Sequence, residues 1–450
     1  MKSRASRISL AVIPAILGWI AAVAAANAAT DPGVRPGAGA GNPLPGLTAD
    51  QATLFQIGQD AFNEVEGLGE GLGPRFNLDS CGGCHSFPVV GGASPAVNPQ
   101  VAVASAFGAR NVVPAFITAN GPIREARYKF GPSGARDGGV HSLFVISGRI
   151  DASGSAATCS AQQDDFDVQF ARGNVSLRIP TPLFGAGLLE SIPDNVLAAN
   201  LARNGLVKAL LGISGHLNAN ANDGRATRFG WKAQNVSLLL FSGEAYNVEM
   251  GLTSELFPTE RSLNPDCQPD TVPNNITGRE GIMDPDQLLS DIEKFALFTR
   301  FLAPPTPSAT EPGGAASITR GRQVFGNIGC GLCHTPSLQT TATTVAALSN
   351  QQVALFSDLA VHRMGPRLAD NILQGNAGPD EFRTAPLWGL GQRIFLLHDG
   401  RTTDLGQAIQ EHASGGTLQF APSEANRVIQ TFRLLSDAAQ QDLLNFLRSL

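Results

Sequence analysis

Two short stretches of this chain share the pattern Cys-x-x-Cys-His, with Cys81, Cys84 and His85 in the first and Cys330, Cys333 and His334 in the second. Redox dithiols, zinc sites and covalent haem all use paired cysteines. The two pairs lie too far apart in the sequence for one zinc ribbon, and a redox dithiol needs no histidine at this position. Covalent haem c requires this order, because two thiols bind the haem vinyl groups and the adjacent histidine ligates the iron. We therefore expect two covalent haem c groups, attached through the four cysteines, with His85 and His334 as iron ligands.

The residues before each motif also repeat. Gly58 and Phe62 precede the first motif with the same spacing as Gly321 and Phe325 before the second, and each pair lies in a helix-like stretch. A glycine at this point permits the close approach of a crossing helix. The end of the chain supplies such a helix, because Ser436 can cap it and its apolar face carries Leu443, Leu444, Leu447 and Leu450.

These patterns predict a mainly α protein of two cytochrome c-like haem domains, with long loops and an insertion that contains some β structure. The expected segments are a signal peptide (1–28), a disordered Pro/Gly-rich linker (29–47), an N-terminal haem domain (48–300), a second linker (301–317) and a C-terminal haem domain (318–450). The insertion covers about 100–180, where SLFVISGRI and DVQFARGNVSLRI are strand-like.

The N-terminus predicts export to the periplasm. Lys2, Arg4 and Arg7 precede an apolar run, which ends at the small residues Ala26-Asn27-Ala28. This order is typical of a cleaved signal peptide; the alternative is a membrane anchor, for which the run is short. No later segment is apolar enough to span a membrane, so we expect no span after cleavage. Acids exceed bases by 38 to 32 in the whole chain, which makes nucleic acid an unexpected partner.

Two cysteines remain outside the motifs. In an oxidising compartment Cys159 and Cys267 could form one disulfide; the alternative is two unrelated buried thiols. A thiol oxidoreductase that acts through this pair is a weaker hypothesis, because the two have no CxxC spacing and no nearby base.

A second iron ligand would separate an electron carrier from an enzyme with an open iron. His412 is the best candidate for the second haem, because Leu405, Ala408 and Ile409 place it on the buried face of one helix; Met364 is the alternative. We interpret His362 as structural and His216 as a loop residue, and His398 in its HDG turn could equally be a structural hydrogen-bond node. His141 could cap the first haem or hold the insertion.

Together the segments resemble the di-haem oxidoreductase family, which is related to the bacterial di-haem cytochrome c peroxidases. The resemblance is carried by GLGPRFNLDSCGGCH, RIPTPLFGAGLLESIP, RFGWKAQNVSLLLFSGEAYNVEMG, FSDLAVHRMGPRLAD and RTAPLWGLGQRIFLLHDGRTTDLGQAIQEH. It implies that Trp231 relays electrons between the haems and that Glu249 is the acid/base residue beside a peroxide-binding iron. It also implies hydrogen peroxide as oxidant and a small electron-donor protein, such as a cytochrome or cupredoxin, as partner.

The chain departs from the peroxidases at three places. His412 stands where the peroxidases carry a methionine ligand to the second haem, and Val101 stands where many of them cap the first haem with a histidine. The Thr-x-Pro that helps to bind an inter-haem calcium is absent from RIFLLHDG, which puts calcium in doubt. Oxidation of an organic or protein substrate, and plain electron transfer with both irons capped, remain alternatives to peroxide reduction.

Overall fold

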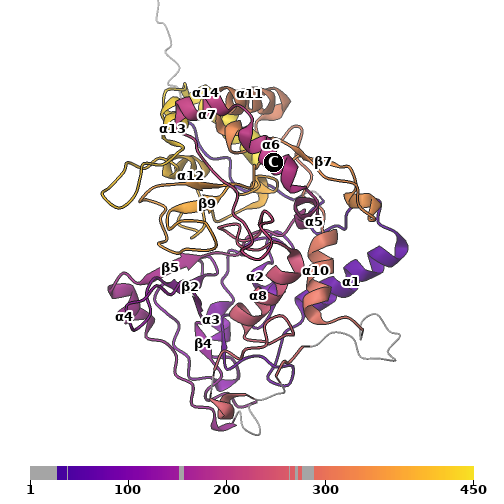
Figure 1. Ribbon diagram of the computed structural model, residues 1–450, viewed down its shortest axis with the longest axis vertical. Coiled ribbons are helices and arrows are strands. Elements are labelled where there is room, and N and C mark those ends of the chain that lie inside the picture. Colours follow the sequence, from indigo (N-terminus) through magenta and orange to yellow (C-terminus); the bar gives the residue numbers. More distant parts are fainter. Residues whose placement is uncertain (1–27, 38, 152–156, 263, 269–271, 276–287) are drawn as a thin grey trace, which may run out of the picture.

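The computed structural model describes residues 28–37, 39–151, 157–262, 264–268, 272–275 and 288–450. The described chain is mainly α-helical, with long loops and small antiparallel sheets, as the sequence predicts. In Figure 1, helices of the last third of the chain gather at the top and the strands of the first half lie below. No helix among the described residues is long and apolar enough to cross a membrane. The predicted signal peptide falls almost wholly outside the described residues.

The α-helices are α1 (Ala49–Asn63), α2 (Cys81–Cys84), α3 (Gln100–Val103), α4 (Phe166–Ala171), α5 (Ala186–Glu190), α6 (Asp194–Ala202), α7 (Gly205–Leu211), α8 (Leu238–Met250), α10 (Asp291–Phe301), α11 (Gly314–Asn327), α12 (Leu405–Glu411), α13 (Asn426–Arg433) and α14 (Asp437–Ser449). Short 3-10 turns are η1 (Ala106–Gly108), η3 (Pro265–Cys267), η4 (Cys330–Leu332), η5 (Ala346–Leu348) and η6 (Leu390–Gln392).

The strands are β1 (Arg75–Phe76), β2 (Glu125–Tyr128), β3 (Val140–His141), β4 (Phe144–Val145), β5 (Val175–Arg178), β6 (Leu338–Gln339), β7 (Gln352–Val353), β8 (Val361–Arg363) and β9 (Glu381–Arg383). These described strands pair with one another in antiparallel fashion. The largest sheet has the order β3-β2-β5, and β1-β4, β6-β7 and β8-β9 form two-stranded sheets.

A pair of closely packed helices stands next to each Cys-x-x-Cys-His motif. The helix that precedes the first motif, α1, packs on α10. The helix that precedes the second motif, α11, packs on α14. Thr48 caps α1 and Ser436 caps α14 by accepting hydrogen bonds from backbone N–H groups. The crossing of α11 by the terminal helix confirms the sequence-based expectation. For the first motif the partner is α10, which the sequence analysis did not single out.

Each crossing is close enough that only glycine fits. A Cβ on Gly58 would clash with the carbonyl oxygen of Lys294 in α10, and one on Gly321 would clash with that of Asp442 in α14. Backbone atoms cannot move away as a flexible side chain would, so a larger residue has to separate the two helices.

We therefore expect Gly321→Ala to lower the free energy of unfolding by about 1–3 kcal/mol or more. Gly326→Ala is the matched control, because it lies in the same helix with nothing within 4 Å of its added Cβ. That variant should be neutral or more stable by about 0.5–1 kcal/mol. Urea unfolding of both variants measures the difference, and equal stabilities would contradict the close-crossing argument.

The insertion contains both predicted and unpredicted structure. Strands β2, β3, β4 and β5 lie within about 100–180, but Phe166–Ala171 forms helix α4 instead of the strand that DVQFAR suggested. The side chain of Asp165 accepts a hydrogen bond from the Val168 backbone N–H, which caps the helix, and Phe166 is buried beneath it. The local cap and one buried aromatic ring outweigh the strand-like alternation here. Cys159 and Cys267 form a disulfide, as the first of the two alternatives predicts.

The expectation that 29–47 is a disordered linker is wrong for the described residues. Asp31 forms an ion pair of 2.6 Å with the buried Arg448, and Arg35 donates to the Arg448 carbonyl oxygen. Leu44 is buried, and its N–H donates to the carbonyl oxygen of Phe301. Proline and glycine prevent a helix or strand, but they do not prevent an extended segment from covering the core and neutralising a buried guanidinium.

Candidate haem sites

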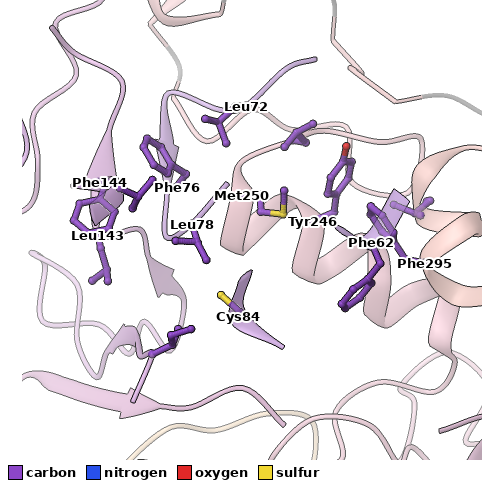
Figure 2. Close-up of a cluster of buried hydrophobic side chains, with 14 of the residues drawn as sticks. Phe62, Leu72, Phe76, Leu78, Cys84, Leu143, Phe144, Tyr246, Met250 and Phe295 are labelled. Atoms are coloured by element: carbon purple, nitrogen blue, oxygen red, sulfur yellow. The ribbon is translucent and has the colours of Figure 1, made fainter. Parts of the chain in front are cut away.

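The first motif opens onto a cavity with an empty volume of about 1110 Å³. The Ser80 side chain accepts a hydrogen bond from the Gly83 N–H and so caps the single turn of α2. This turn places Cys81, Cys84 and His85 together on the cavity wall. Figure 2 shows Cys84 beside buried apolar side chains, including Leu78 of the preceding loop and residues of α8.

The His85 ring is prepared to ligate a metal through Nε2. Its Nδ1 lies 3.1 Å from the Gly92 carbonyl oxygen, which fixes the proton on Nδ1. Burial lowers the pKa of His85 to about 4, so the imidazole is neutral at physiological pH. A neutral ring whose second nitrogen donates to a carbonyl is the arrangement usual for histidine ligands.

The second motif lines a larger cavity, with an empty volume of about 1440 Å³. Cys330 is the first residue of the 3-10 turn η4, Cys333 follows its last residue, and His334 comes next. His334 Nδ1 lies 3.0 Å from the Phe356 carbonyl oxygen, as His85 Nδ1 does from Gly92. Burial, together with the neighbouring His412, lowers the pKa of His334 to about 4.

His412 lines the same cavity as His334. It follows the last turn of α12, and its Nδ1 lies 2.8 Å from the Ala408 carbonyl oxygen. Burial lowers the pKa of His412 as well. Met364, the alternative ligand, also lines this cavity. Both candidate iron ligands, His412 and Met364, therefore line the cavity of the second motif. His412 additionally has the oriented, neutral ring that is usual for a histidine ligand.

The residues at both sites fit a covalently attached haem. Each cavity is lined by two cysteines and by a histidine with an oriented Nδ1. The four motif cysteines are free, whereas the other two form the disulfide. Burial raises the pKa of Cys81, Cys84 and Cys330, so these thiols are not poised as redox nucleophiles. Paired inert thiols on an apolar cavity are suited to holding a large apolar group.

Glu249 is the acidic residue at the end of α8 and lines the first cavity together with His85. Burial and the nearby Glu125 raise the pKa of Glu249 to about 8, and Arg127 opposes this shift. The carboxyl is therefore mainly protonated at neutral pH, yet close to its titration point. This position and pKa suit a residue that takes up and returns a proton.

Trp231 borders both cavities. Its ring is buried, Nε1 donates to the Ile179 carbonyl oxygen at 2.9 Å, and the side chain lines the first and the second cavity. It also meets the ring of His398 edge to face at 6.4 Å. The structure thus brings Trp231 between the two sites that the sequence defines by widely separated motifs.

His141 is not placed to cap the first site. Its Nε2 lies 2.9 Å from Asp137 and its Nδ1 lies 2.8 Å from Asp164, so both ring nitrogens have carboxylate partners. The ring stacks on Tyr128 at 3.5 Å and does not line the first cavity. Of the two sequence-based alternatives for His141, holding the insertion together is the one that these contacts support.

The three remaining histidines have different surroundings. His216 pairs with Glu381 at 3.1 Å. His398 stacks on Phe382 at 4.3 Å and lines the second cavity. His362 also lines that cavity, held between Asp358 at 3.0 Å and Glu424 at 2.8 Å.

A calcium site is not tested by these contacts. Among the described residues, the group that could hold a metal ion is Cys333, Asp358 and His362, and its cysteine belongs to the second motif. The oxygen atoms around Lys232, the residue after Trp231, already bind a cation of the chain itself. The buried Lys232 ammonium lies 3.0 Å from Asp370 and donates to the carbonyl oxygens of Gly378 and Glu381 at 2.8 Å. The missing Thr-x-Pro before the HDG turn therefore remains the observation that bears on calcium, and it speaks against it.

Sequence reasoning missed Arg383 and Arg393, which both line the second cavity. Each precedes an apolar run, APLW separated by one residue from Arg383 and IFLL directly after Arg393, and a basic residue beside such a run is a signal for a buried charge.

Two cavities, each lined by the residues of one Cys-x-x-Cys-His motif, border the same tryptophan. The profile of the family described as "Di-haem oxidoreductase, putative peroxidase" matches residues 136–450. The chain therefore belongs to the di-haem oxidoreductase family, for which haem is the implied cofactor. A comparison with curated proteins finds no match.

Two solved structures show distant similarity. Hydrazine synthase of Kuenenia stuttgartiensis is 13% identical with a TM-score of 0.34, over 100% of both chains. A MauG-like protein associated with microbial copper homeostasis is 17% identical with a TM-score of 0.30, over 60% of this chain and 90% of its own. At these scores neither similarity bears on the function.

Proposed function

We propose that this protein is an exported, periplasmic di-haem c oxidoreductase that reduces hydrogen peroxide at its N-terminal site. The C-terminal site would be six-coordinate, with His334 and His412 as ligands, and would receive electrons from a small donor protein such as a cytochrome or cupredoxin. Cys81 and Cys84 would attach the first haem, and Cys330 and Cys333 the second.

The observation that carries this proposal is the difference between the two cavities. The second is lined by His334 and His412, both neutral and both with Nδ1 on a carbonyl oxygen. Among the described residues that line the first, His85 is the one histidine, and the thioether of Met250 lies 3.6 Å from Cys81, beside the attachment cysteine. This difference supports a second haem with two protein ligands and a first haem that would keep one face free for a small oxidant.

Haem iron at the first site would supply the two electrons that cleave the O–O bond, with H2O2, two protons and two electrons giving two molecules of water. Glu249 would take the proton from the near oxygen and return it to the leaving oxygen, because its pKa of about 8 lies near the working pH. Trp231 would link the two centres, since its ring borders both cavities. Buried Ile179 fixes this ring through its carbonyl oxygen.

The EPR spectrum of the ferric protein, repeated after one-electron reduction, tests the proposal. We expect a high-spin signal from the open N-terminal haem beside a low-spin signal from the C-terminal haem. One-electron reduction should remove the low-spin signal first and leave an iron that reacts with added peroxide. Two low-spin signals in both states would overturn the proposal in favour of a plain electron carrier.

A further inference from the structure

Arg383 and Arg393 form a buried pair of positive charges without a counter-charge in the described chain. Their exposed fractions are 9% and 6%. Burial lowers the pKa of both to about 10, and the positive charge of Arg393 lowers the pKa of Arg383 further. The positive charge of Arg448, which is itself paired with Asp31, likewise lowers the pKa of Arg393. No carboxylate of the described residues forms an ion pair with either guanidinium.

The hydrogen bonds leave most of the two guanidinium groups unused. Arg383 donates through Nε to the Gly230 carbonyl oxygen at 2.9 Å, and its backbone N–H donates to the Trp231 carbonyl oxygen. Arg393 Nε and Nη2 are buried and have no partner among the described residues. An unpaired buried charge is strongly destabilising, because the desolvation cost is not offset. The arrangement is therefore complete only when an anion that is not part of the chain binds here.

The position of the pair indicates which anion this is. Both arginines line the second cavity and also a smaller one with an empty volume of about 580 Å³. Trp231 lines this smaller cavity too, and Thr181, Leu183 and Gly230 connect it to the first site. The arginines thus stand at the edge of the second haem site that faces the first. Haem carries two carboxylates on one edge, and arginine suits planar carboxylate recognition.

We propose that Arg383 and Arg393 bind the propionates of the C-terminal haem and hold that edge toward Trp231. This inference rests on the part of the proposed function that places a haem in the second cavity. The arginines are positioning residues: the two thioether bonds of Cys330 and Cys333 would set the rotation of the haem, and the arginines would hold its propionate edge in place and add positive charge beside it. A haem with its propionate edge toward Trp231 presents its carboxylates to the path between the two centres.

Resonance Raman spectroscopy of the one-electron-reduced holoprotein tests this contact, because the C-terminal haem alone is then ferrous. The bending modes of its propionates respond to hydrogen bonds on the carboxylates. We expect Arg393→Gln and Arg383→Gln each to shift these modes. Arg393→Gln should also shift the reduction equilibrium of this haem about tenfold toward the oxidised form, because a nearby positive charge is lost; tenfold is 59 mV for a one-electron couple.

Two further variants separate contact from charge and from folding. Arg393→Lys keeps the charge, so the potential should return toward the wild-type value while the propionate modes stay shifted. Arg228→Gln is the matched control, because Arg228 is equally buried but pairs with Asp194 within the chain and lines none of the three cavities. Its spectrum and potential should match those of the wild type.

The inference is overturned if the propionate modes are unchanged in the Arg383 and Arg393 variants. It is also overturned if inorganic phosphate or succinate binds to the wild-type holoprotein with an Arg393-dependent, saturable spectral change, because the site would then serve a free anion. Unshifted modes with a normal peroxide reaction would remove the propionate contact and leave the proposed function intact. Shifted propionate modes without a peroxide reaction would support the propionate contact and overturn the proposed peroxide reduction.

Discussion

Glu249→Gln is expected to slow the reaction of the protein with hydrogen peroxide by about 10²–10⁴-fold, the usual contribution of a positioned acid/base residue. Glutamine has nearly the same shape as glutamate but cannot take up and return a proton. The haem ligands are untouched, so the EPR spectrum should not change. Stopped-flow absorption after mixing with peroxide measures the effect directly.

The pH dependence gives a second test of the same role. Only the carboxylate form of Glu249 can accept the proton of the bound peroxide, and burial holds the pKa of this group at about 8. The wild-type rate should therefore rise as the pH increases toward 8. Glu249→Gln should lack that rise, and a rise preserved in the variant would assign the titration to another group.

Glu244→Gln is the control for Glu249. Glu244 lies in the same helix and bonds to Asn235, but it does not line the first cavity. Its replacement should leave the maximal peroxide rate little changed and move the pH profile slightly to lower pH, because the charge of Glu244 contributes to the raised pKa of Glu249. If both variants react at the wild-type rate, Glu249 is a buried acid without a role in proton transfer, and another group that lines the first cavity must perform it.

His412→Met is expected to raise the potential of the C-terminal haem by on the order of 0.1 V, within the ~0.8 V range that axial ligands span. Thioether ligation favours reduced iron more than imidazole ligation does. The more tightly held electron should slow turnover with a donor protein, while the first reaction of the N-terminal haem with peroxide continues. A spectroelectrochemical titration gives the potential.

Met364→Leu is the matched comparison, because Met364 lines the same cavity. If His412 is the ligand, Met364→Leu should keep the low-spin spectrum and nearly the same potential. If Met364→Leu instead converts the C-terminal haem to high spin, Met364 is the ligand and the assignment of His412 is wrong. The two variants together therefore decide the ligand without reference to activity.

Several features of this protein follow from the sequence alone. The two Cys-x-x-Cys-His motifs, the glycine before each and the cap at Ser436 are local signals that depend only on neighbours in the chain. Local signals predicted the α11–α14 crossing because Gly321 and the apolar face of the terminal helix are both readable from spacing. The same approach failed at α4, where the cap by Asp165 and the burial of Phe166 outweighed a strand-like pattern.

Contacts between residues far apart in the sequence were decided by the tertiary structure alone. The packing of α1 on α10, the ordering of Asp31 by Arg448 and the pairing of His141 with Asp164 join segments that share no pattern. Sequence spacing also cannot show that Trp231 borders both cavities, or that two buried arginines have no counter-charge among the residues that the structure describes. Local chemistry is set by residue type and neighbours, whereas burial and charge balance depend on every segment that folds around a site.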